Sequence, residues 1–393
     1  MAPSQTRLRR SVIDVLEANG PQSRAEIARK TGVSRSTMSA VISSLLAEGL
    51  VQETEDRADV SKAAGRPGTR VALADPKGYY VGIDFGRIFI KAAISNAHFE
   101  IIDQVAADFD IDMPAEAALD FAAARVEEII ARSGIDRAQI RAVGIGVPGP
   151  VDAATGGLHA GSILARWVGT DVPGGLSDRL DLPVYMDNDA NLGMLAESVH
   201  GAAKQTNVAL YVLLSIGVGL GIAINGQIFR GASGIAGELG HVVIDEHGDV
   251  CRCGSRGCLE ATISVNALAR ALSASHGDIS TDEMLRRAVA GDVGARRVIA
   301  DAGALVGRSV GALCSYFNPE IVIVGGELMR AGDTLLNPLK DAMKRFAIAR
   351  AVENVRVIPA ALGEQAEIIG TLLFAGEKAR AAATAAELFG ERA

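Results

Sequence analysis

Apolar residues near the start of the chain repeat at helical spacing and predict three short helices. The first helix carries its apolar residues on one face: Leu8, Val12, Val15 and Leu16. Ser23 and Glu26 form the capping-box pattern that begins the second helix, and a turn at Gly32 ends it. Ser34 is the expected N-cap of the third helix. The apolar face of that helix carries Val41, Ile42, Leu45 and Leu46.

The opposite face of the third helix is short, polar and able to form hydrogen bonds. Two short helices, a glycine turn and a polar third helix are typical of a helix-turn-helix, whose third helix enters the major groove. A small helical hairpin that never contacts DNA fits the same pattern. If the module binds DNA, the candidate contacts on this helix are Ser34, Arg35, Ser36, Thr37 and Ser39.

The segment after the third helix favours DNA binding over a plain helical hairpin. A polar stretch follows Val51, and the residues 65–70 then lead into the strand-like residues 71–73, a pattern typical of a β-hairpin wing. Arg66 stands between Gly65 and Pro67 at the predicted wing tip. An arginine so placed is suited to a narrow minor groove, where A·T-rich DNA concentrates negative potential. The sequence therefore predicts a winged helix-turn-helix over residues 1–75.

Beyond residue 79 the pattern changes to apolar runs that alternate with helices. Strands are expected at 80–83, 89–95, 142–147, 208–214, 221–224 and 321–324, and a helix at 115–132. This alternation predicts an α/β class with largely buried sheets. The most apolar stretch, residues 208–224, is interrupted by glycines and is too short to cross a bilayer comfortably, so we expect no membrane partner.

Charge is distributed unevenly along the 393 residues. The chain carries a net charge of −8, but residues 1–74 hold 11 Lys and Arg against 8 Asp and Glu, which leaves 28 against 39 for the remainder. The basic excess therefore coincides with the predicted DNA-binding module. An apolar signal segment is absent from the N-terminal residues, and four cysteines are too few for a disulfide scaffold, so we expect a cytoplasmic protein.

Three of the four cysteines gather in one short segment. Cys251, Cys253 and Cys258 fall within eight residues, and His241 lies ten residues before the first of them. Three thiolates and one imidazole make the closed tetrahedral set expected of structural zinc, Zn²⁺. The alternative is a surface loop with free thiols. Cys314 stands alone in an apolar run and is expected to be a buried core thiol.

Three motifs follow one another in the order and spacing of a known family. Residues 187–191 read DNDAN, residues 237–241 read GELGH, and residues 251–260 read CRCGSRGCLE. Together they resemble the signatures of the ROK family (repressors, open reading frames, kinases), and the helix-turn-helix with a Gly-Arg-Pro wing is similar to the family's xylose-, N-acetylglucosamine- and glucose-type repressors. The resemblance covers essentially the whole chain. It implies that residues 76–393 adopt the actin-like, hexokinase-like fold, with one lobe at 79–190 plus the C-terminal helix and another at 191–362.

The resemblance also implies a sugar site in the cleft between those lobes. Its expected residues are Gly149, Asn188, Asp189, Glu238, His241 and Glu260. Carboxylates and amides are suited to this role because they bind vicinal hydroxyls through paired hydrogen bonds. The segment 161–167 departs from the family, since it lacks an Asn that often precedes Trp167. Ser162 is the nearest substitute, so the identity of the sugar stays open.

The same resemblance supplies the rival hypothesis, an ATP-dependent sugar kinase or a bifunctional kinase and regulator. Asp189 stands where those kinases keep their general base. The kinase pattern Asp-x-Gly-Gly-Thr, however, reads DFGRI at 84–88, and Gly-Thr-Gly-x-Gly-Gly-Gly reads SIGVGLG at 215–221. Arg87 thus replaces a glycine, and Ile88 and Ile216 replace threonines that would bind phosphate. Arg87 still offers one positive charge, so weak nucleotide binding stays open.

We therefore predict a transcriptional regulator, in effect a repressor, that is not an enzyme. It is expected to bind an inverted-repeat operator as a homodimer or homotetramer. Its DNA affinity is expected to change when a monosaccharide effector binds.

Overall fold

The computed structural model describes residues 8–9, 11–13, 15–16, 19–47, 51–55, 69–73, 78–152, 155–158 and 163–389. Two compact units make up the chain: residues 1–78 together with 380–393, and residues 79–379. Arg66 at the predicted wing tip and Ser162 lie outside the described residues.

The first unit is a helical module followed by a two-stranded sheet. All residues described between 8 and 19 are helical, and α2 (Arg24–Thr31) and α3 (Arg35–Ala47) follow. The capping box of Ser23 and Glu26 is present, and Gly32 ends α2 with a φ of 71°, which favours glycine. Strands β1 (Val51–Glu55) and β2 (Thr69–Leu73) pair antiparallel, as the predicted wing requires.

The core of this unit explains why α3 presents one face outward. Val41, Ile42 and Leu45 are buried as the pattern predicted, and Met38 joins them on the same face. The cluster is completed by residues of the helix that precedes α2, of α2 itself, and of β1 and β2. The polar face of α3 is thereby left outside this core.

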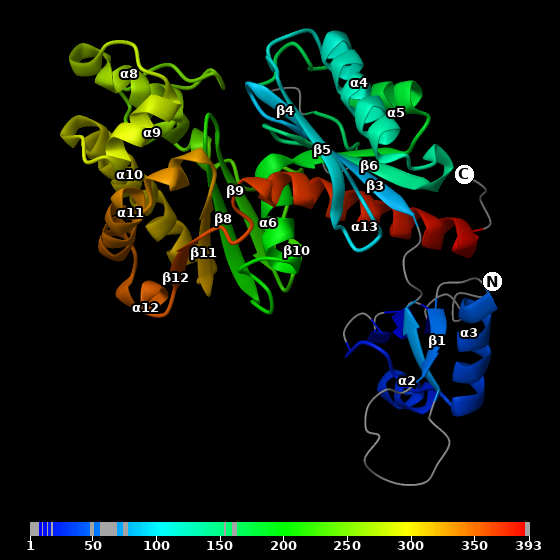
Figure 1. Ribbon diagram of the computed structural model, residues 1–393. Coiled ribbons are helices and arrows are strands. Elements are labelled where there is room, and N and C mark those ends of the chain that lie inside the picture. The colour runs from blue at the N-terminus through cyan, green and yellow to red at the C-terminus, as the bar shows by residue number, and fades with distance from the viewer. Residues whose placement is uncertain are drawn as a thin grey trace. The chain divides into compact units, whose positions relative to one another are not determined.

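The second unit contains two five-stranded sheets with the same topology (Figure 1). The first sheet has the order β5-β4-β3-β6-β7 and comprises β3 (Tyr79–Phe85), β4 (Phe89–Ser95), β5 (Ile101–Asp108), β6 (Ile140–Val147) and β7 (Val184–Asn188). The second has the order β10-β9-β8-β11-β12 and comprises β8 (Val208–Leu214), β9 (Val218–Ile224), β10 (Gln227–Ile228), β11 (Ile321–Gly325) and β12 (Arg356–Pro359). In each sheet three antiparallel strands are followed by two parallel ones. The strand expected at 221–224 begins at Val218.

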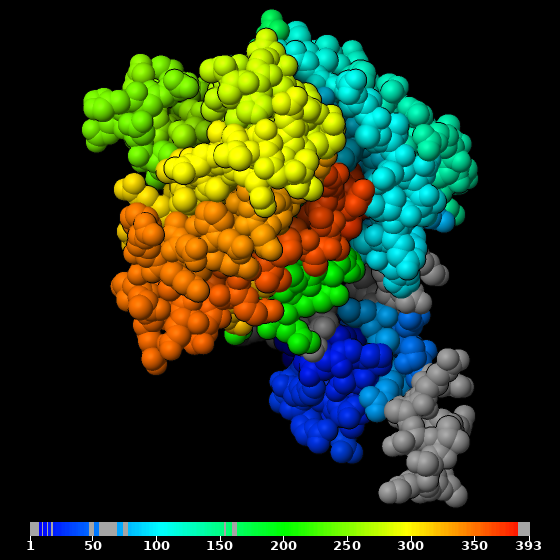
Figure 2. Space-filling view, turned by 60° about the vertical axis from the view of Figure 1, so that its left-hand side comes forward, coloured from blue at the N-terminus to red at the C-terminus, as the bar shows by residue number. Residues whose placement is uncertain are grey.

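Helices cover the two sheets and divide the unit into two lobes. The first core includes α4 (Ala115–Ser133) and α5 (Val172–Leu180) packed on the first sheet. Around the second sheet lie α7 (Leu259–Ile263), α8 (Val265–His276), α9 (Thr281–Val289), α10 (Val293–Phe317), α11 (Asp333–Phe346) and α12 (Ala349–Val352). Two further helices, α6 (Asp189–Val199) and α13 (Ala366–Phe389), pack on each other between the sheets. Orange-red residues of this C-terminal region are visible between the cyan and yellow surfaces of the two lobes in Figure 2.

One helix of the described residues, α10, is long and apolar enough to cross a membrane by length and composition alone. Its apolar face, which includes Ile299, Val306 and Val310, is buried in the core of the second lobe. Cys314 on the same helix is fully buried, as the sequence predicted. This packing is that of a core helix.

Glycines in the first sheet allow α13 to approach it closely. A Cβ atom added at Gly144 would lie 2.1 Å from the backbone oxygen of Thr371, so the backbone of β6 or α13 would have to shift. We expect Gly144→Ala to lower the free energy of unfolding of the second unit by about 1–3 kcal/mol or more, because overpacking forces backbone shifts. Thermal unfolding would measure the change, with Gly157→Ala as the control, since its nearest neighbour is the Thr155 hydroxyl at 3.6 Å. Equal unfolding temperatures for the two variants would contradict this packing.

Candidate functional site

A cavity of about 340 Å³ lies in the second unit and takes its lining from both lobes. The β3–β4 turn, the end of β6 and the β7–α6 junction contribute from one side, and the β8–β9 turn and α7 from the other. All six residues predicted for the sugar site line it: Gly149, Asn188, Asp189, Glu238, His241 and Glu260. Gly149 and Glu260 are 111 positions apart in the sequence, and folding brings both into one cavity, as a site between two lobes requires.

The start of α6 positions Asn188 and Asp189. Asn188 is the N-cap, and its Oδ1 accepts hydrogen bonds from the backbone N–H groups of Ala190 and Asn191. Its Nδ2 donates to the backbone oxygen of Gly149 at 3.2 Å, which ties the β6 loop to the helix. The backbone N–H of Ala190 also donates to Asp189 Oδ1 at 2.8 Å. Both side chains are therefore held by the helix terminus rather than by a loop.

Glu260 is the point at which the two lobes meet inside the cavity. Arg87 on the β3–β4 turn donates from Nη2 to Glu260 Oε1 at 2.7 Å, and both side chains are more than nine-tenths buried. The backbone N–H of Val218 donates to Glu260 Oε2 at 3.0 Å. Each carboxylate oxygen keeps a further lone pair, so the group can still accept from a ligand hydroxyl.

Two buried carboxyl groups, Asp84 and Glu367, and the half-buried Asp189 line the cavity. Burial, and then the negative charge of Glu367, raises the pKa of Asp84 to about 7. Burial, with the charges of Asp84 and Glu367, raises the pKa of Asp189 well above its usual range. Burial likewise raises the pKa of Glu367, although Tyr211 donates a hydrogen bond to it at 2.6 Å and opposes that shift. These groups favour their protonated forms, in which a carboxyl can donate as well as accept.

The raised pKa of Asp84 makes stability depend on pH. The unfolded chain releases this proton near pH 3.8 and the folded protein only near pH 7, so stability is full below the first value and falls as pH rises toward the second. We expect Asp84→Asn, which cannot ionise, to gain up to about 1.4 kcal/mol per pH unit over the wild type between pH 5 and 7. Chemical denaturation at four pH values would measure this difference. A difference that does not change with pH would contradict the raised pKa.

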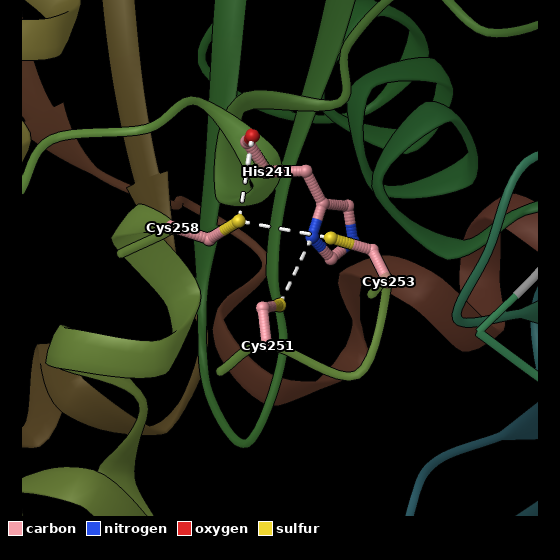
Figure 3. A group of neighbouring side chains, drawn as sticks. All are labelled: His241, Cys251, Cys253 and Cys258. Atoms are coloured by element: carbon pink, nitrogen blue, oxygen red, sulfur yellow. Dashed lines mark hydrogen bonds between the residues drawn. The ribbon is translucent and has the colours of Figure 1, made fainter. Parts of the chain in front are cut away.

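His241, Cys251, Cys253 and Cys258 come together as the sequence predicted. Their ligand atoms all lie within 4.8 Å of one another (Figure 3). Cys251 Sγ lies 3.5 Å from His241 Nδ1, and Cys253 Sγ lies 3.6 Å from Cys258 Sγ. A tetrahedral zinc ion with bonds of about 2.0–2.3 Å separates its ligand atoms by roughly 3.3–3.8 Å. The cluster can therefore hold one metal ion with little rearrangement.

The two ring nitrogens of His241 allow it to serve both of its predicted roles, as a metal ligand and as a sugar-site residue. Nδ1 faces the cysteines (Figure 3). Nε2 lies 3.7 Å from Glu238 Oε2, and both residues line the cavity. One histidine can thus bind a metal through Nδ1 and leave Nε2 for a carboxylate or a ligand, an arrangement common around metal-bound histidines. Burial lowers the pKa of His241, which favours the neutral imidazole that metals bind.

Two thiols of the cluster, those of Cys251 and Cys258, have raised pKa values. Burial, reinforced by the neighbouring cysteines, raises the pKa of Cys258 to about 12, and burial raises that of Cys251. A divalent cation would reverse this preference because it binds thiolates and releases their protons. Three sulfur atoms and one imidazole nitrogen within 4.8 Å of one another are the donor set that a thiophilic metal prefers.

The residues predicted to contact DNA lie at the start of α3. Ser34, Arg35, Ser36 and Thr37 are exposed, and the Ser34 hydroxyl accepts from the backbone N–H of Thr37 at 3.2 Å. Ser39 is only half-buried, and its backbone oxygen accepts from Arg24. The first turn of α3 is therefore the part of this helix most open to a ligand.

Three residues at the cavity were not predicted from the sequence: Glu367 and Lys91, which line it, and Tyr211, which donates a hydrogen bond to Glu367. Glu367 begins α13 and lines the cavity, and Lys91 lines it from β4. The one available signal was an acidic residue among the apolar residues 366–369, since a carboxylate in such a run is seldom buried without a role.

Comparisons with known protein families give a match for each of the two units. The ROK family profile matches residues 80–378, more than half of the chain. The chain belongs to the ROK family. The MarR family profile matches residues 6–59 of this ROK protein, which covers the helices of the first unit.

Relatives of this ROK protein include both regulators and kinases. It is 28% identical to the xylose repressor of Bacillus subtilis over 352 residues, or 90% of each chain. It is 31% identical to the glucokinase of Halalkalibacterium halodurans over 309 residues, or 74% of this chain and 93% of that one. The crystal structure of a ROK family transcriptional regulator, a homologue of the Escherichia coli MLC protein, shares the fold, with a TM-score of 0.78, 22% identity and coverage of 95% and 96%.

Proposed function

We propose that this protein is a sugar-responsive transcriptional repressor that acts in the cytoplasm. The observation that carries the proposal is that one chain combines a winged helix-turn-helix, whose third helix has an exposed polar start, with a cavity lined by all six predicted sugar residues. The similarity to the B. subtilis xylose repressor extends over both units and supports the same combination of functions.

The charges around the cavity favour an uncharged monosaccharide as the effector. Seven carboxyl groups of the described residues line it: Asp84, Asp189, Glu238, Glu260, Glu327, Glu364 and Glu367. The described basic residues in the lining are three, and each has a partner: Arg87 binds Glu260, Lys91 donates to the Glu364 backbone oxygen, and Arg330 binds Asp282. A phosphate or carboxylate on the ligand would therefore find no unpaired positive charge among the described lining residues, whereas hydroxyls would find many hydrogen-bond partners.

The Cys₃His cluster is proposed to hold one structural Zn²⁺. The ion would fix His241, and through it the position of Glu238, and it would hold the loop that leads to Glu260. A sugar would then meet three binding groups in a preset arrangement, which lowers the entropy that binding costs.

DNA affinity would respond to the sugar because the cavity is lined by both lobes. Binding would stabilise one arrangement of the lobes, and in a homodimer or homotetramer that choice would alter the spacing of two winged modules on an inverted repeat. The sugar would thereby lower operator affinity.

A sugar kinase is the second candidate, since the retained Asp189 and the glucokinase relative both favour it. The isoleucines at 88 and 216 and the arginine at 87 argue against phosphoryl transfer. A coupled assay of ATP consumption across a monosaccharide panel distinguishes the two functions. Turnover at roughly 1–100 s⁻¹, the usual range for kinases, would replace the repressor proposal.

The DNA-binding half of the proposal is tested with Arg35→Ala. Arg35 is exposed at the start of α3, where a side chain can reach a base edge. We expect roughly a 5- to 150-fold loss of affinity, equivalent to about 1–3 kcal/mol, for a DNA site selected from a random pool by the wild-type protein. Arg297→Ala on α10, which also removes an exposed positive charge, but from the other unit, serves as control. Equal affinities for the two variants in a gel-shift titration would contradict the assignment of α3.

A further inference from the structure

An ion pair outside the cavity joins the edges of the two sheets. β7 and β10 are edge strands of their sheets, and Asp187 on β7 pairs with Arg230, which lies two residues after β10. Arg230 donates to Asp187 Oδ2 from Nε at 2.8 Å and from Nη2 at 2.6 Å. The Asp187 side chain is only 4% exposed. Neither residue lines the cavity, so a sugar bound there would not touch this pair.

The second oxygen of the Asp187 carboxylate holds the start of α6. Asp187 Oδ1 accepts from the backbone N–H of Asn188 at 2.7 Å and from Asn191 Nδ2 at 3.2 Å. Asn191 is buried in the first turn of α6. Donors from Arg230 and from α6 together fill the roughly four acceptor positions that one carboxylate offers. Asp187 therefore fixes the junction that carries Asn188 and Asp189.

Arg230 begins the loop that carries two other residues of the predicted sugar site. Glu238 and His241 follow it in the sequence by eight and eleven positions. At Gly237 and Gly240, an added Cβ would lie 2.0 and 2.3 Å from backbone oxygens of β9, so the end of this loop packs directly on that strand. The backbone of the loop thus belongs to the second sheet, while the Arg230 side chain reaches the first.

The shape of the Arg230 side chain suits it to this link. Its planar guanidinium offers two nitrogens to the Asp187 carboxylate and lies 5.9 Å from the centre of the Phe374 ring on α13. A lysine would offer one nitrogen on a flexible stem and would hold the carboxylate less firmly. The guanidinium therefore restrains Asp187 in orientation as well as in charge.

We propose that Arg230 is a positioning residue of the sugar site, which acts through Asp187 to hold the start of α6 in place relative to the loop 231–241. The inference rests on the proposed function and adds to it a residue that does not touch the sugar. Groups contributed by two lobes bind a ligand tightly when their positions are set before it arrives. Without Arg230, Asp187 would be a buried carboxylate that has lost its partner, which is strongly unfavourable. Its side chain would then leave its place and release the start of α6.

Isothermal titration calorimetry on the full chain tests this role, with glucose, xylose, mannose, galactose and N-acetylglucosamine as probes. For the sugar that binds the wild type most tightly, we expect Arg230→Gln to lower the affinity at least about tenfold. Asp187→Asn keeps the shape of the side chain but has one acceptor oxygen, so it cannot serve Arg230 and α6 at once. It should cause a similar loss, and it decides the matter if Arg230→Gln does not fold. Arg230→Lys keeps the charge and should stay within about threefold of the wild type.

A double-mutant cycle separates positioning from a merely structural role. Asp189→Ala removes a group that Arg230 is proposed to hold in place. In that background Arg230→Gln should therefore cost little more, about threefold or less, because effects of residues that act together do not add. A residue that only stabilised the fold would lower the sugar affinity by the same factor in both backgrounds.

Arg179→Gln is the matched control. Arg179 also binds carboxylates, those of Glu116 and Asp120, and its side chain is 25% exposed against 32% for Arg230. It does not line the cavity, and its partners lie on α4. The substitution should leave the sugar affinity unchanged.

Two kinds of failure can be told apart. Wild-type sugar affinity in both Arg230→Gln and Asp187→Asn, or equal losses in the two backgrounds of the cycle, would overturn the positioning role and leave the proposed function standing. A wild type that binds none of the five sugars would overturn the proposed function and the inference together.

Discussion

Cys253→Ser is expected to release the metal and to abolish the response to sugar. The substitution removes one of four ligands from a cluster whose atoms lie within 4.8 Å of one another. Cys251 and Cys258 are buried, so replacing Cys253 disturbs the packing of the loop least. Structural zinc sites contribute apparent binding energies of about 10–16 kcal/mol in small domains, and even losing a supporting residue weakens metal affinity about 10- to 100-fold.

Elemental analysis and calorimetry would measure the two effects of this change. The wild type should contain about one zinc per chain, which is the capacity of one four-ligand site, and the variant far less. The variant's sugar affinity should fall at least about tenfold, because His241 and the loop before Glu260 lose their anchor. Cys314→Ser alters a buried thiol outside the cluster and should keep the metal. A metal-free Cys253→Ser protein with full sugar affinity would show that the cluster does not support the site.

Asp189→Ala is expected to cause the second large effect, a loss of sugar binding by about 10- to 100-fold. Asp189 lines the cavity at the start of α6, and removing its carboxyl takes away a hydrogen-bonding partner whether or not the group is protonated. A hydrogen bond to a charged group contributes about 1.5–3 kcal/mol, and a buried ligand hydroxyl left without its partner costs about 1–3 kcal/mol even when that partner was neutral. Asp178→Ala removes an exposed carboxyl from α5 and should have no effect.

Asp189→Asn tests whether the Asp189 carboxyl is protonated when sugar is bound. If the carboxyl is protonated in the complex, as its raised pKa favours, the neutral amide should retain more affinity than alanine does. In cells, Asp189→Ala should repress even at sugar concentrations that release the wild type. Unchanged sugar affinity in Asp189→Ala would remove this residue from the site.

Local features of the fold were predictable from the sequence because they depend on near neighbours. Ser23 and Glu26 lie three residues apart, and their capping box needs only the helix that they begin. The metal cluster was predictable for a similar reason, since three of its four ligands fall in one loop. The short motifs at 187–191 and 237–241 indicated the sugar site only because they resemble those of a known family. Their spacing alone does not predict a sugar site.

Long-range pairings were not predictable in the same way. Arg87 and Glu260 are 173 positions apart, and nothing in either segment indicates the other. Tyr211 and Glu367 are separated by 156 positions, and the pKa of Asp84 depends on the burial that folding imposes. The sequence indicates Arg87 as a replaced glycine and as a positive charge, but not its ion pair, because that pair depends on how the two lobes close over the cavity. Arg66 of the predicted wing lies outside the described residues, so its role stays a prediction.

A single titration can show whether one protein couples sugar binding to DNA binding. Fluorescence anisotropy would measure the affinity of the purified full chain for a selected inverted-repeat DNA site, with and without the monosaccharide that stabilises the protein most in a thermal-shift panel. We expect the sugar to weaken DNA binding about 5- to 150-fold, the range of a coupling free energy of about 1–3 kcal/mol. An affinity for DNA that is the same at zero and at saturating sugar would contradict it.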